Sequence, residues 1–299
     1  MVVAYSPFES TALFWIAQDK GFFAQNGLDV TVRKYDSGAA SLEGVLKGEA
    51  DIAIGVTEFP LVRQALLKKR VRAIAAIDTG EYIYVVARKD RGITKASDLK
   101  GRRVGTTVGT IADFYLGRFL ELNGLSIKDV RLVDVKTPTG WVNAVADGEV
   151  DAISTAQPYA DAARKRLGDN AVSWSAQSRQ PLFALAVATD EWIAEHPRQI
   201  ERFLKAMARA EDHVVRDPAD AKVIAQKALD LDAAYIQTVW SQNQYALSLD
   251  QSLILAMEDE ARWLIKNRLT TETAMPDFAD RIYADGLRAV RPEAVDVTR

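Results

Sequence analysis

The sequence predicts an α/β protein of two lobes, with mostly parallel sheets and a helical C-terminal extension. Over the first two thirds of the 299 residues, short β-like segments alternate with amphipathic segments, which is typical of parallel sheets covered by helices. A short motif recurs at an offset of about one hundred residues. From Asp190 onward, apolar residues recur at helical spacing.

The first block alternates expected strands and helices. Val2–Tyr5 predicts a strand, and Leu28–Tyr35 alternates apolar and polar residues like a half-buried strand. The motif Gly48–Ile52 ends one helix and opens a short apolar strand. The remaining expected elements are helices at Thr11–Lys20, Ala39–Lys47 and from Pro60, and strands at Arg72–Ile77 and Tyr82–Arg88.

A second block repeats this plan. The segment Gly148–Ala152 closely copies Gly48–Ile52, and Asn123–Leu125 matches Asn26–Leu28. Gly-x-x-Asp is also a common joint between a helix and a strand, so either motif alone carries little weight. Because two landmarks agree in order and offset, we interpret the repeat as two lobes of similar plan.

The C-terminal part returns to the first lobe and then becomes helical. Leu182–Thr189 predicts a strand, and two strands near Val85–Arg88 and Leu185–Thr189 are expected to cross between the lobes as a hinge. We expect Trp240, Trp263 and Tyr283 to lie in the core. The later helices are expected at Ala219–Leu229, Ala233–Leu247, Gln251–Asn267 and Asp277–Ala289.

The composition excludes several classes of function. Hydrophobic residues make up 48% and charged residues 26%, as in ordinary globular proteins. The 38 basic residues are scattered among 41 acidic ones, with a net charge of -3, so nucleic-acid binding has little support. The chain has no cysteine, which excludes thiol catalysis, disulfides and cysteine metal sites. We therefore expect no metal and no cofactor.

An ordered series of motifs resembles a known family. Each motif is weak alone, but the series runs in order over roughly residues 1–215. The motifs are Phe14–Ala17, Lys20–Phe23, Gly27–Val30, Ser37-Gly38, Leu46–Ala53, Asp98–Gly105, Gly109-Thr110, Val150–Ala152 and Pro158-Tyr159. They resemble the nitrate/sulfonate/taurine group of ABC substrate-binding proteins, which includes binders of thiamine pyrimidine precursors.

The resemblance implies a type II periplasmic-binding-protein fold. Lobe 1 would comprise residues 1–88 and 185–299, and lobe 2 residues 89–184. The implied function is the solute-binding component of an ABC importer, which captures a small organic molecule in the cleft between the lobes. That molecule would be sulfonate- or taurine-like, amine-bearing or an aromatic heterocycle. The implied partners are an ABC permease and ATPase.

The offset repeat and the two linking strands predict a monomer with a hinge, and the resemblance implies a location in the periplasm or another extracytoplasmic space. Met1 is followed at once by the strand-like Val2–Tyr5. From the residues alone, the protein is therefore either cytosolic or made with a leader that this sequence lacks.

The ligand is expected beyond the carboxyl ends of the strands, as in other open parallel sheets. Ser37-Gly38 and Gly109-Thr110 precede expected helices, whose N-termini attract anions and accepting groups. Plain helix capping would also explain these residues.

Several acidic residues cluster in the strand-end loops of the first lobe, which favours an amine, a zwitterion or an N–H-bearing heterocycle over a bare anion. Most such carboxylates are solvated loop charges, whereas Glu58, between an apolar strand and Phe59-Pro60, is as well explained by a ligand contact. The acids are Glu9, Asp36, Glu58, Asp78 and Glu81, and aromatic residues that could sandwich a ligand are Phe8, Phe59, Tyr82, Trp141 and Tyr159. The candidate ligand-binding residues are Phe8, Glu9, Ser10, Ser37, Gly38, Thr57, Glu58, Glu81, Tyr82, Gly109, Thr110, Trp141, Gln157 and Tyr159.

Two alternative functions stay open. A ligand-sensing receptor domain would have the same fold, and some enzymes share it as well. The chain has only two histidines, His196 and His213, and no zinc or phosphate-loop motif. Pyrimidine synthases related to this family depend on a cysteine-rich segment, which this chain cannot supply. We therefore predict a binding protein without catalytic residues.

Overall fold

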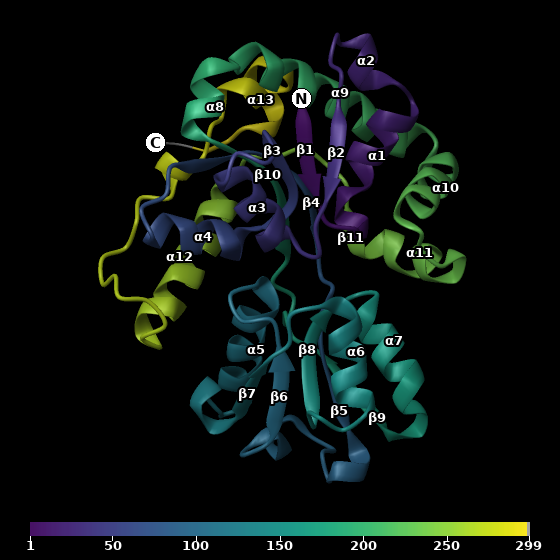
Figure 1. Ribbon diagram of the computed structural model, residues 1–299, viewed down its shortest axis with the longest axis vertical. Coiled ribbons are helices and arrows are strands. Elements are labelled where there is room, and N and C mark those ends of the chain that lie inside the picture. The colour runs from purple at the N-terminus through teal and green to yellow at the C-terminus, as the bar shows by residue number, and fades with distance from the viewer. Residues whose placement is uncertain (298–299) are drawn as a thin grey trace. The chain divides into compact units, whose positions relative to one another are not determined.

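The computed structural model describes residues 1–297, which form two α/β units (Figure 1). Unit 1 comprises Met1–Gly80 and Leu182–Arg299, and unit 2 comprises Glu81–Pro181. The sequence placed the two boundaries after residues 88 and 184. The strand at residues 83–88 pairs with strands of unit 2, and the strand that begins at Leu182 pairs with strands of unit 1. Each boundary therefore lies a few residues earlier.

The sheet of unit 1 has six strands in the order β11-β4-β10-β3-β1-β2. β1 is parallel to β2 and β3, whereas β10 is antiparallel to both β3 and β4. β11 adds a short antiparallel pair at the end of β4. The strands are β1 (Val2–Tyr5), β2 (Thr31–Lys34), β3 (Ile52–Thr57), β4 (Val71–Gly80), β10 (Leu182–Thr189) and β11 (Asn243–Gln244).

The sheet of unit 2 has five strands in the order β7-β6-β8-β5-β9. β6 is parallel to β7 and β8, and β5 is antiparallel to β8 and β9. The strands are β5 (Ile83–Arg88), β6 (Arg103–Thr106), β7 (Arg131–Asp134), β8 (Ala152–Ala156) and β9 (Ala171–Ser175). Both sheets are thus mixed, because each contains antiparallel strands beside a parallel core.

Helices pack on both sheets. In unit 2, α5 lies on one face of the sheet, and α6 and α7 lie together on the other (Figure 1). In unit 1, α1 packs on α9 and α10, and α4 packs on α12. The helices of unit 2 are α5 (Ile111–Leu122), α6 (Pro138–Ala146) and α7 (Tyr159–Leu167). Those of unit 1 are α1 (Ala12–Asp19), α2 (Phe22–Gln25), α3 (Gly38–Leu46), α4 (Glu58–Leu66), α8 (Asp190–Glu195), α9 (Pro197–Arg216), α10 (Pro218–Leu229), α11 (Ala233–Val239), α12 (Gln251–Lys266) and α13 (Asp285–Val290).

The predicted α/β fold with a helical C-terminal part is confirmed, but the sheets are mixed rather than mostly parallel, and three local expectations differ. Residues 182–188 of β10 are all buried, as expected for a strand covered on both faces. By contrast, β2 is a shorter edge strand whose four residues are exposed, not a half-buried strand over Leu28–Tyr35. The expected single helix Ala233–Leu247 ends at Val239 and is followed by a 3-10 helix, Trp240–Gln242, and β11. The expected helix Asp277–Ala289 is instead a 3-10 turn at Ala279–Arg281 followed by α13, which begins only at Asp285.

The repeated motif forms the same joint in both units. Gly48 and Gly148 both have positive φ, +73° and +81°, where glycine avoids the strain of a side chain. The aspartate three residues after each glycine binds the central strand of the three parallel strands, which is β1 in unit 1 and β6 in unit 2. The amide of Val2 donates to Asp51 Oδ2 at 2.7 Å, and the amide of Arg103 donates to Asp151 Oδ2 at 3.0 Å. The prediction of two units of similar plan therefore has a structural basis.

Among the described residues, no helix is both long enough and apolar enough to cross a lipid bilayer.

We predict that Asp151→Ala lowers the free energy of unfolding by about 1–3 kcal/mol, because the amide of Arg103 loses its acceptor. Asp151 is 7% exposed and also pairs with the Arg103 guanidinium at 2.8 Å. Urea unfolding measures the change. Glu149→Ala is the matched control, since Glu149 belongs to the same motif but is exposed. Equal stability of the two variants would contradict this role for the joint.

Candidate functional site

The carboxyl ends of the parallel strands define one edge in each unit. We call the strand-end loops at residues 6–11, 37–38, 55–58 and 78–80 the unit 1 edge. The loops at residues 106–110, 136–140 and 156–159, with residues 81–82, form the unit 2 edge. Residues 81–82 belong there because Ile83 of antiparallel β5 lies opposite Ala156 of β8.

The structure places the predicted ligand-binding residues on these two edges. Phe8, Glu9, Ser10, Ser37, Gly38, Thr57 and Glu58 come from the unit 1 edge, and Glu81, Tyr82, Gly109, Thr110, Gln157 and Tyr159 from the unit 2 edge, with Trp141 on the first turns of the adjoining α6. Their contact with a ligand stays a prediction.

Two glycines let the backbone of the unit 1 edge pack closely. A Cβ on Gly38 would lie 2.3 Å from the carbonyl oxygen of Gly55, so only glycine allows α3 to start this close to β3. Gly55 has a φ of +69°, and a Cβ there would lie 2.7 Å from the Thr11 methyl group. The register of β10 against β3 shifts beside Gly55, as at a β-bulge. The bend brings Ser6, Ser10 and Thr11 against β3.

Ser37 caps α3. Its side-chain oxygen accepts a hydrogen bond from the amide of Ala40 at 3.2 Å. The residue at the same place in unit 2, Thr137, accepts from the amide of Gly140 at the same distance. Capping therefore explains the choice of Ser37, and it leaves the hydroxyl proton free to act as a donor.

Glu9 is buried rather than solvated. It follows β1 at the start of a short 3-10 helix and is 1% exposed. Its Oε1 accepts a hydrogen bond from the Tyr235 hydroxyl at 2.8 Å, whereas Oε2 has no hydrogen-bond partner in the protein. Burial raises the pKa of Glu9 to about 7. The sequence favoured a solvated loop charge here, and burial by α11 overturns that interpretation.

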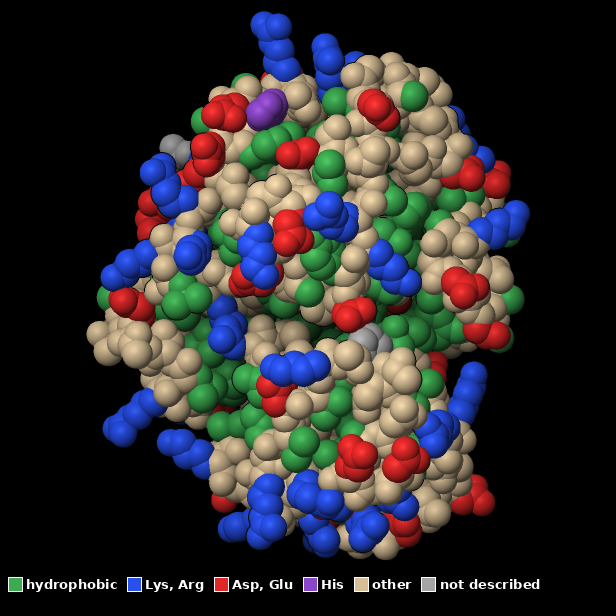
Figure 2. All heavy atoms as spheres, viewed as in Figure 1, with side chains coloured by type: hydrophobic (Ala, Val, Ile, Leu, Met, Phe, Trp, Pro, Cys, Tyr) green, Lys and Arg blue, Asp and Glu red, His purple; other side chains and the backbone are tan. Residues whose placement is uncertain are grey.

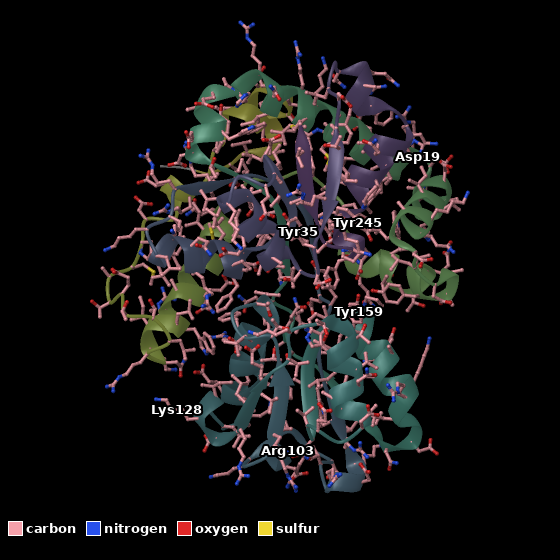
Figure 3. The ribbon with its side chains drawn as sticks, in the orientation of Figure 1. Asp19, Tyr35, Arg103, Lys128, Tyr159 and Tyr245 are labelled. Carbon is pink, nitrogen blue, oxygen red and sulfur yellow. The ribbon has the colours of Figure 1, made fainter. Side chains whose placement is uncertain are left out.

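Asp78 and Tyr245 complete the same cluster. Asp78 lies near the carboxyl end of β4, is fully buried, and has neither oxygen in a hydrogen bond of normal geometry. Burial, and then the charge of Glu9, raises its pKa well above the usual value, and the nearby amides of Gln244 and Thr79 oppose this shift. Tyr245, labelled in Figure 3, is 6% exposed, and its hydroxyl has no partner. Its pKa is raised by burial and then by the charges of Asp78 and Glu9.

The sequence reasoning named Asp78 among the loop acids but did not select it as a site residue, and it missed Tyr235 and Tyr245 altogether. Tyr235 lies on α11 and Tyr245 directly after β11. Strand β11 has two residues, too few to produce a periodic pattern. Only the pairing of Asn243 with Gly80 brings this segment to the unit 1 edge.

Glu58 lies in a different environment from Glu9. It is the first residue of α4, is fully buried, and accepts a hydrogen bond at Oε2 from the amide of Phe183 at 3.0 Å. Its pKa is raised to about 8 by burial. Glu260 of α12 is also buried, and its pKa is raised by burial and then by the charge of Glu58. The two carboxyls therefore form an acidic pair between packed helices.

At the unit 2 edge, one glutamine joins the loops. Gln177 Oε1 accepts from the amides of Tyr82 and Ile83 at 2.7 and 2.8 Å, and its Nε2 donates to the carbonyl of Gln180. Gln157 is 4% exposed. Its backbone N–H donates to the carbonyl of Tyr82, and its side-chain Oε1 accepts from the backbone N–H of Asp161. Tyr82 and Gln157 are therefore held in one hydrogen-bonded frame.

Trp141 and Tyr159 form an aromatic corner of the unit 2 edge. Their ring centroids lie 5.2 Å apart, with an edge-to-face angle of 83°. Trp141 Nε1 donates to Thr107 Oγ1 and to the carbonyl of Val135, both at 2.8 Å. Tyr159 is partly exposed and is labelled in Figure 3. A fixed indole beside a partly exposed phenol provides a surface for a flat or apolar group.

The Gly109-Thr110 turn is less open to an anion than its sequence predicts. The amide of Gly109 already donates to Asp113 Oδ2 at 3.0 Å, and the Thr110 hydroxyl donates to the carbonyl of Thr107. Nearby, the buried hydroxyls of Thr106 and Thr155 have no partner in the protein. The hydroxyl groups of β6 and β8 are therefore the better-placed polar groups at this edge.

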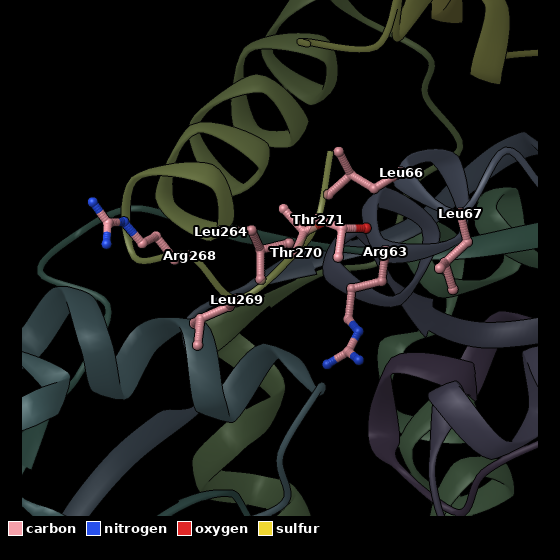
Figure 4. A pocket seen from close by; sticks show the side chains of 8 residues that line it. All are labelled: Arg63, Leu66, Leu67, Leu264, Arg268, Leu269, Thr270 and Thr271. Carbon is pink, nitrogen blue, oxygen red and sulfur yellow. The ribbon is translucent and has the colours of Figure 1, made fainter. Parts of the chain in front are cut away.

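A hollow of about 380 Å³ lies elsewhere in unit 1, between the end of α4 and the end of α12 (Figure 4). Leucines line it, with Arg63 and Arg268 at its margins, and no predicted ligand-binding residue contributes to it.

On the face shown in Figure 2, basic and acidic side chains occur next to each other in both units. The described residues contain no group of three histidines or carboxylates able to hold a metal ion.

We predict that the free energy of unfolding falls as pH rises from about 4.5 to about 8, because the folded state retains protons that the unfolded state releases. Glu58→Gln should remove part of this fall, on the order of 3 kcal/mol, and should be more stable than the parent protein at pH 8. Denaturant unfolding at several pH values measures both effects. The control is Glu195→Gln at an exposed position, and an unchanged pH dependence in Glu58→Gln would refute the interpretation.

Comparison with known proteins finds a family model and several curated proteins that match most of this chain. The family model described as NMT1/THI5 like matches residues 9–221. A Brucella abortus protein, provisionally described as a binding protein, is 26% identical over 262 residues, 85% of this chain and 79% of its own. The 4-amino-5-hydroxymethyl-2-methylpyrimidine phosphate synthase of Aspergillus parasiticus is 25% identical over 224 residues, 70% of this chain and 64% of the synthase.

A solved structure has the same fold. The alkanesulfonate-binding protein SsuA of Xanthomonas axonopodis pv. citri, bound to MOPS, superposes with a TM-score of 0.81 at 16% identity, over 95% of this chain and 98% of SsuA. The fold predicted from the motif series is thereby confirmed. Because the family model spans most of the sequence, this chain belongs to the NMT1/THI5-like family.

Proposed function

We propose that this protein is the solute-binding component of an ABC importer and captures a small organic molecule without changing it. The observation that carries the proposal is the set of buried polar atoms without protein partners at the two strand edges. In folded proteins such atoms are normally paired, and ligands of open α/β sheets bind at the carboxyl ends of the strands. Within or directly beside the loops of these edges, the atoms include Ser6 Oγ, Glu9 Oε2, Glu58 Oε1, both carboxylate oxygens of Asp78, Tyr245 Oη, Thr106 Oγ1 and Thr155 Oγ1.

The relatives support a binding role more than a catalytic one. Relatives of this chain include a sulfonate-binding protein and a provisional binding protein, but also a pyrimidine phosphate synthase. In this chain neither histidine belongs to a strand edge. His196 lies between α8 and α9, and its ring stacks on Trp192 with centroids 4.9 Å apart, while His213 of α9 contacts Asp220 at 2.8 Å. The strand edges therefore offer hydrogen-bonding groups without an imidazole base.

The partners and the location follow from this role. A solute-binding component delivers its ligand to an ABC permease driven by an ATPase, and we propose that this protein does so as a monomer outside the cytoplasm. A ligand-sensing receptor domain would have the same edges, and stimulation of a reconstituted transporter's ATPase distinguishes the two. The prediction that the ligand lies between the units, and that strands act as a hinge, stays a prediction.

We predict that a screen of sulfonates, amines, pyrimidines and aromatic acids contains a compound that raises the melting temperature. Saturation at one hundred times Kd stabilises the folded state by about 2.7 kcal/mol, which for a chain of this size corresponds to a rise of several degrees. Thermal-shift assays measure the rise.

The compound that binds should be recovered unchanged after prolonged incubation, as shown by mass spectrometry of the supernatant. A binding protein needs different affinities in two states and no tuned base. Conversion of the compound in amounts beyond the protein present would replace the proposal with an enzymatic function. The absence of any stabilising compound from a broad screen would argue against solute capture itself.

A further inference from the structure

The most unusual feature of unit 1 is an acidic cluster that the protein itself does not neutralise. Glu9 and Asp78 are 1% and 0% exposed, and no described basic side chain forms an ion pair with either of them. One oxygen of Glu9, both oxygens of Asp78 and the Tyr245 hydroxyl have no hydrogen-bond partner. Burying an unpaired carboxylate costs several kcal/mol or forces it to take up a proton.

The four residues of the cluster converge from separate parts of the chain. Glu9 follows β1, Asp78 lies near the carboxyl end of β4, Tyr235 lies on α11 and Tyr245 follows β11. The Tyr235 hydroxyl donates to Glu9 Oε1 at 2.8 Å, which orients the carboxyl group and leaves Oε2 available. Ser6, whose hydroxyl is buried and unpaired, lies at the same edge. A cluster built from four segments at the strand edge is positioned as a binding subsite rather than as a cap or an incidental loop charge.

The chemistry of these groups selects a nitrogen cation. Carboxylate oxygens only accept hydrogen bonds when ionised, and a phenol can accept one as well. An ammonium or amidinium group supplies several N–H donors together with a positive charge, which matches the free oxygens of the cluster. Ca²⁺ would require six to eight oxygen ligands, and the described residues contain no carboxylate group of three. A sulfonate or inorganic anion would be repelled here.

We propose that the solute carries an ammonium or amidinium group, which Glu9, Asp78 and Tyr245 hold at the unit 1 edge. The inference rests on the proposed solute-binding function and specifies its ligand class. The sequence analysis expected Glu58 to accept hydrogen bonds from the ligand's N–H group, and this proposal assigns that role to Glu9 and Asp78 instead. Glu58 keeps one unpaired oxygen, Oε1, but its Oε2 accepts from the amide of Phe183 and its neighbour is the buried acid Glu260, with which it forms an acidic pair. The aromatic corner of unit 2 plays no part in binding the cation.

Matched probes test the ligand class. Taurine is compared with ethanesulfonate, and benzamidine with benzamide. In each pair only the first compound carries a nitrogen cation. Thermal shift and titration calorimetry should detect binding of the cationic members alone. Binding should strengthen as pH rises from about 5 to 8, since Glu9 and Asp78, facing Tyr235 and Tyr245, must lose protons to pair with a cation. A neutral or anionic member that binds as well as its cationic partner would overturn the inference.

Variants test the residues. Asp78→Asn and Glu9→Gln should each weaken binding of the cationic probe by at least about thirtyfold. The matched control is Glu260→Gln, a buried acid of the same unit outside the cluster, which should bind normally. Unchanged affinity in both cluster variants would refute the assignment. Calcium chloride serves as a further probe, and stabilisation by Ca²⁺ that Asp78→Asn abolishes would replace the nitrogen cation with a metal.

The ligand-free protein gives an independent test. If the cluster is maintained for a cation, Asp78→Asn and Glu9→Gln remove an uncompensated charge and should raise the melting temperature at pH 8. If the acids serve only the fold, the same variants should lower it, and that result would overturn the inference even when none of the probes binds. A broad screen without any ligand, combined with raised melting temperatures, would instead count against the proposed solute capture and leave the cation site supported.

Discussion

The fold depends on a joint that ties each central strand to its neighbour. In both units a glycine with positive φ ends a helix, and three residues later an aspartate bonds the first residue of the central strand through both its carboxylate and its amide. Because the joint sets where Val2 and Arg103 begin relative to β3 and β8, it also sets where β1 and β6 end. The strand-end loops consequently come together at one edge of each sheet.

The two edges share a backbone plan but differ in chemistry. The unit 1 edge contains buried carboxyls and phenols, and the unit 2 edge contains threonine hydroxyls, a glutamine frame and the Trp141–Tyr159 corner. A fold that is repeated for structural reasons thus provides two unlike surfaces. Each surface therefore has its own set of complementary groups, so the chemistry of one edge gives no guide to what the other would bind.

Much of the fold could be predicted from the sequence, because the joint is encoded locally. The motifs at Gly48 and Gly148, the apolar strands that follow them and the polar strand-end loops are all visible in short windows. The environment of Glu9 was not visible, because it depends on Tyr235, Tyr245 and Asp78, which are distant in the sequence. The expected helix over Ala233–Leu247 concealed β11, the element that carries Tyr245 to the edge. Burial of a charge by long-range packing has no periodic signature.

Burial alone does not identify the binding subsite, since unit 1 has two buried acidic groupings. Glu58 and Glu260 lie between α4 and α12, and a proton retained by the pair, together with the amide of Phe183, accounts for their stability in the fold. Glu9 and Asp78 lie at the ends of strands, and there Tyr235 satisfies only one of their four carboxylate oxygens. Glu58 also follows the end of a strand and has one unpaired oxygen, Oε1, so an unsatisfied acceptor alone does not separate the two groupings. They differ in their neighbours, because Glu58 faces a second acid on a packed helix, whereas Glu9 and Asp78 lie beside two phenol groups, one of which already donates to Glu9.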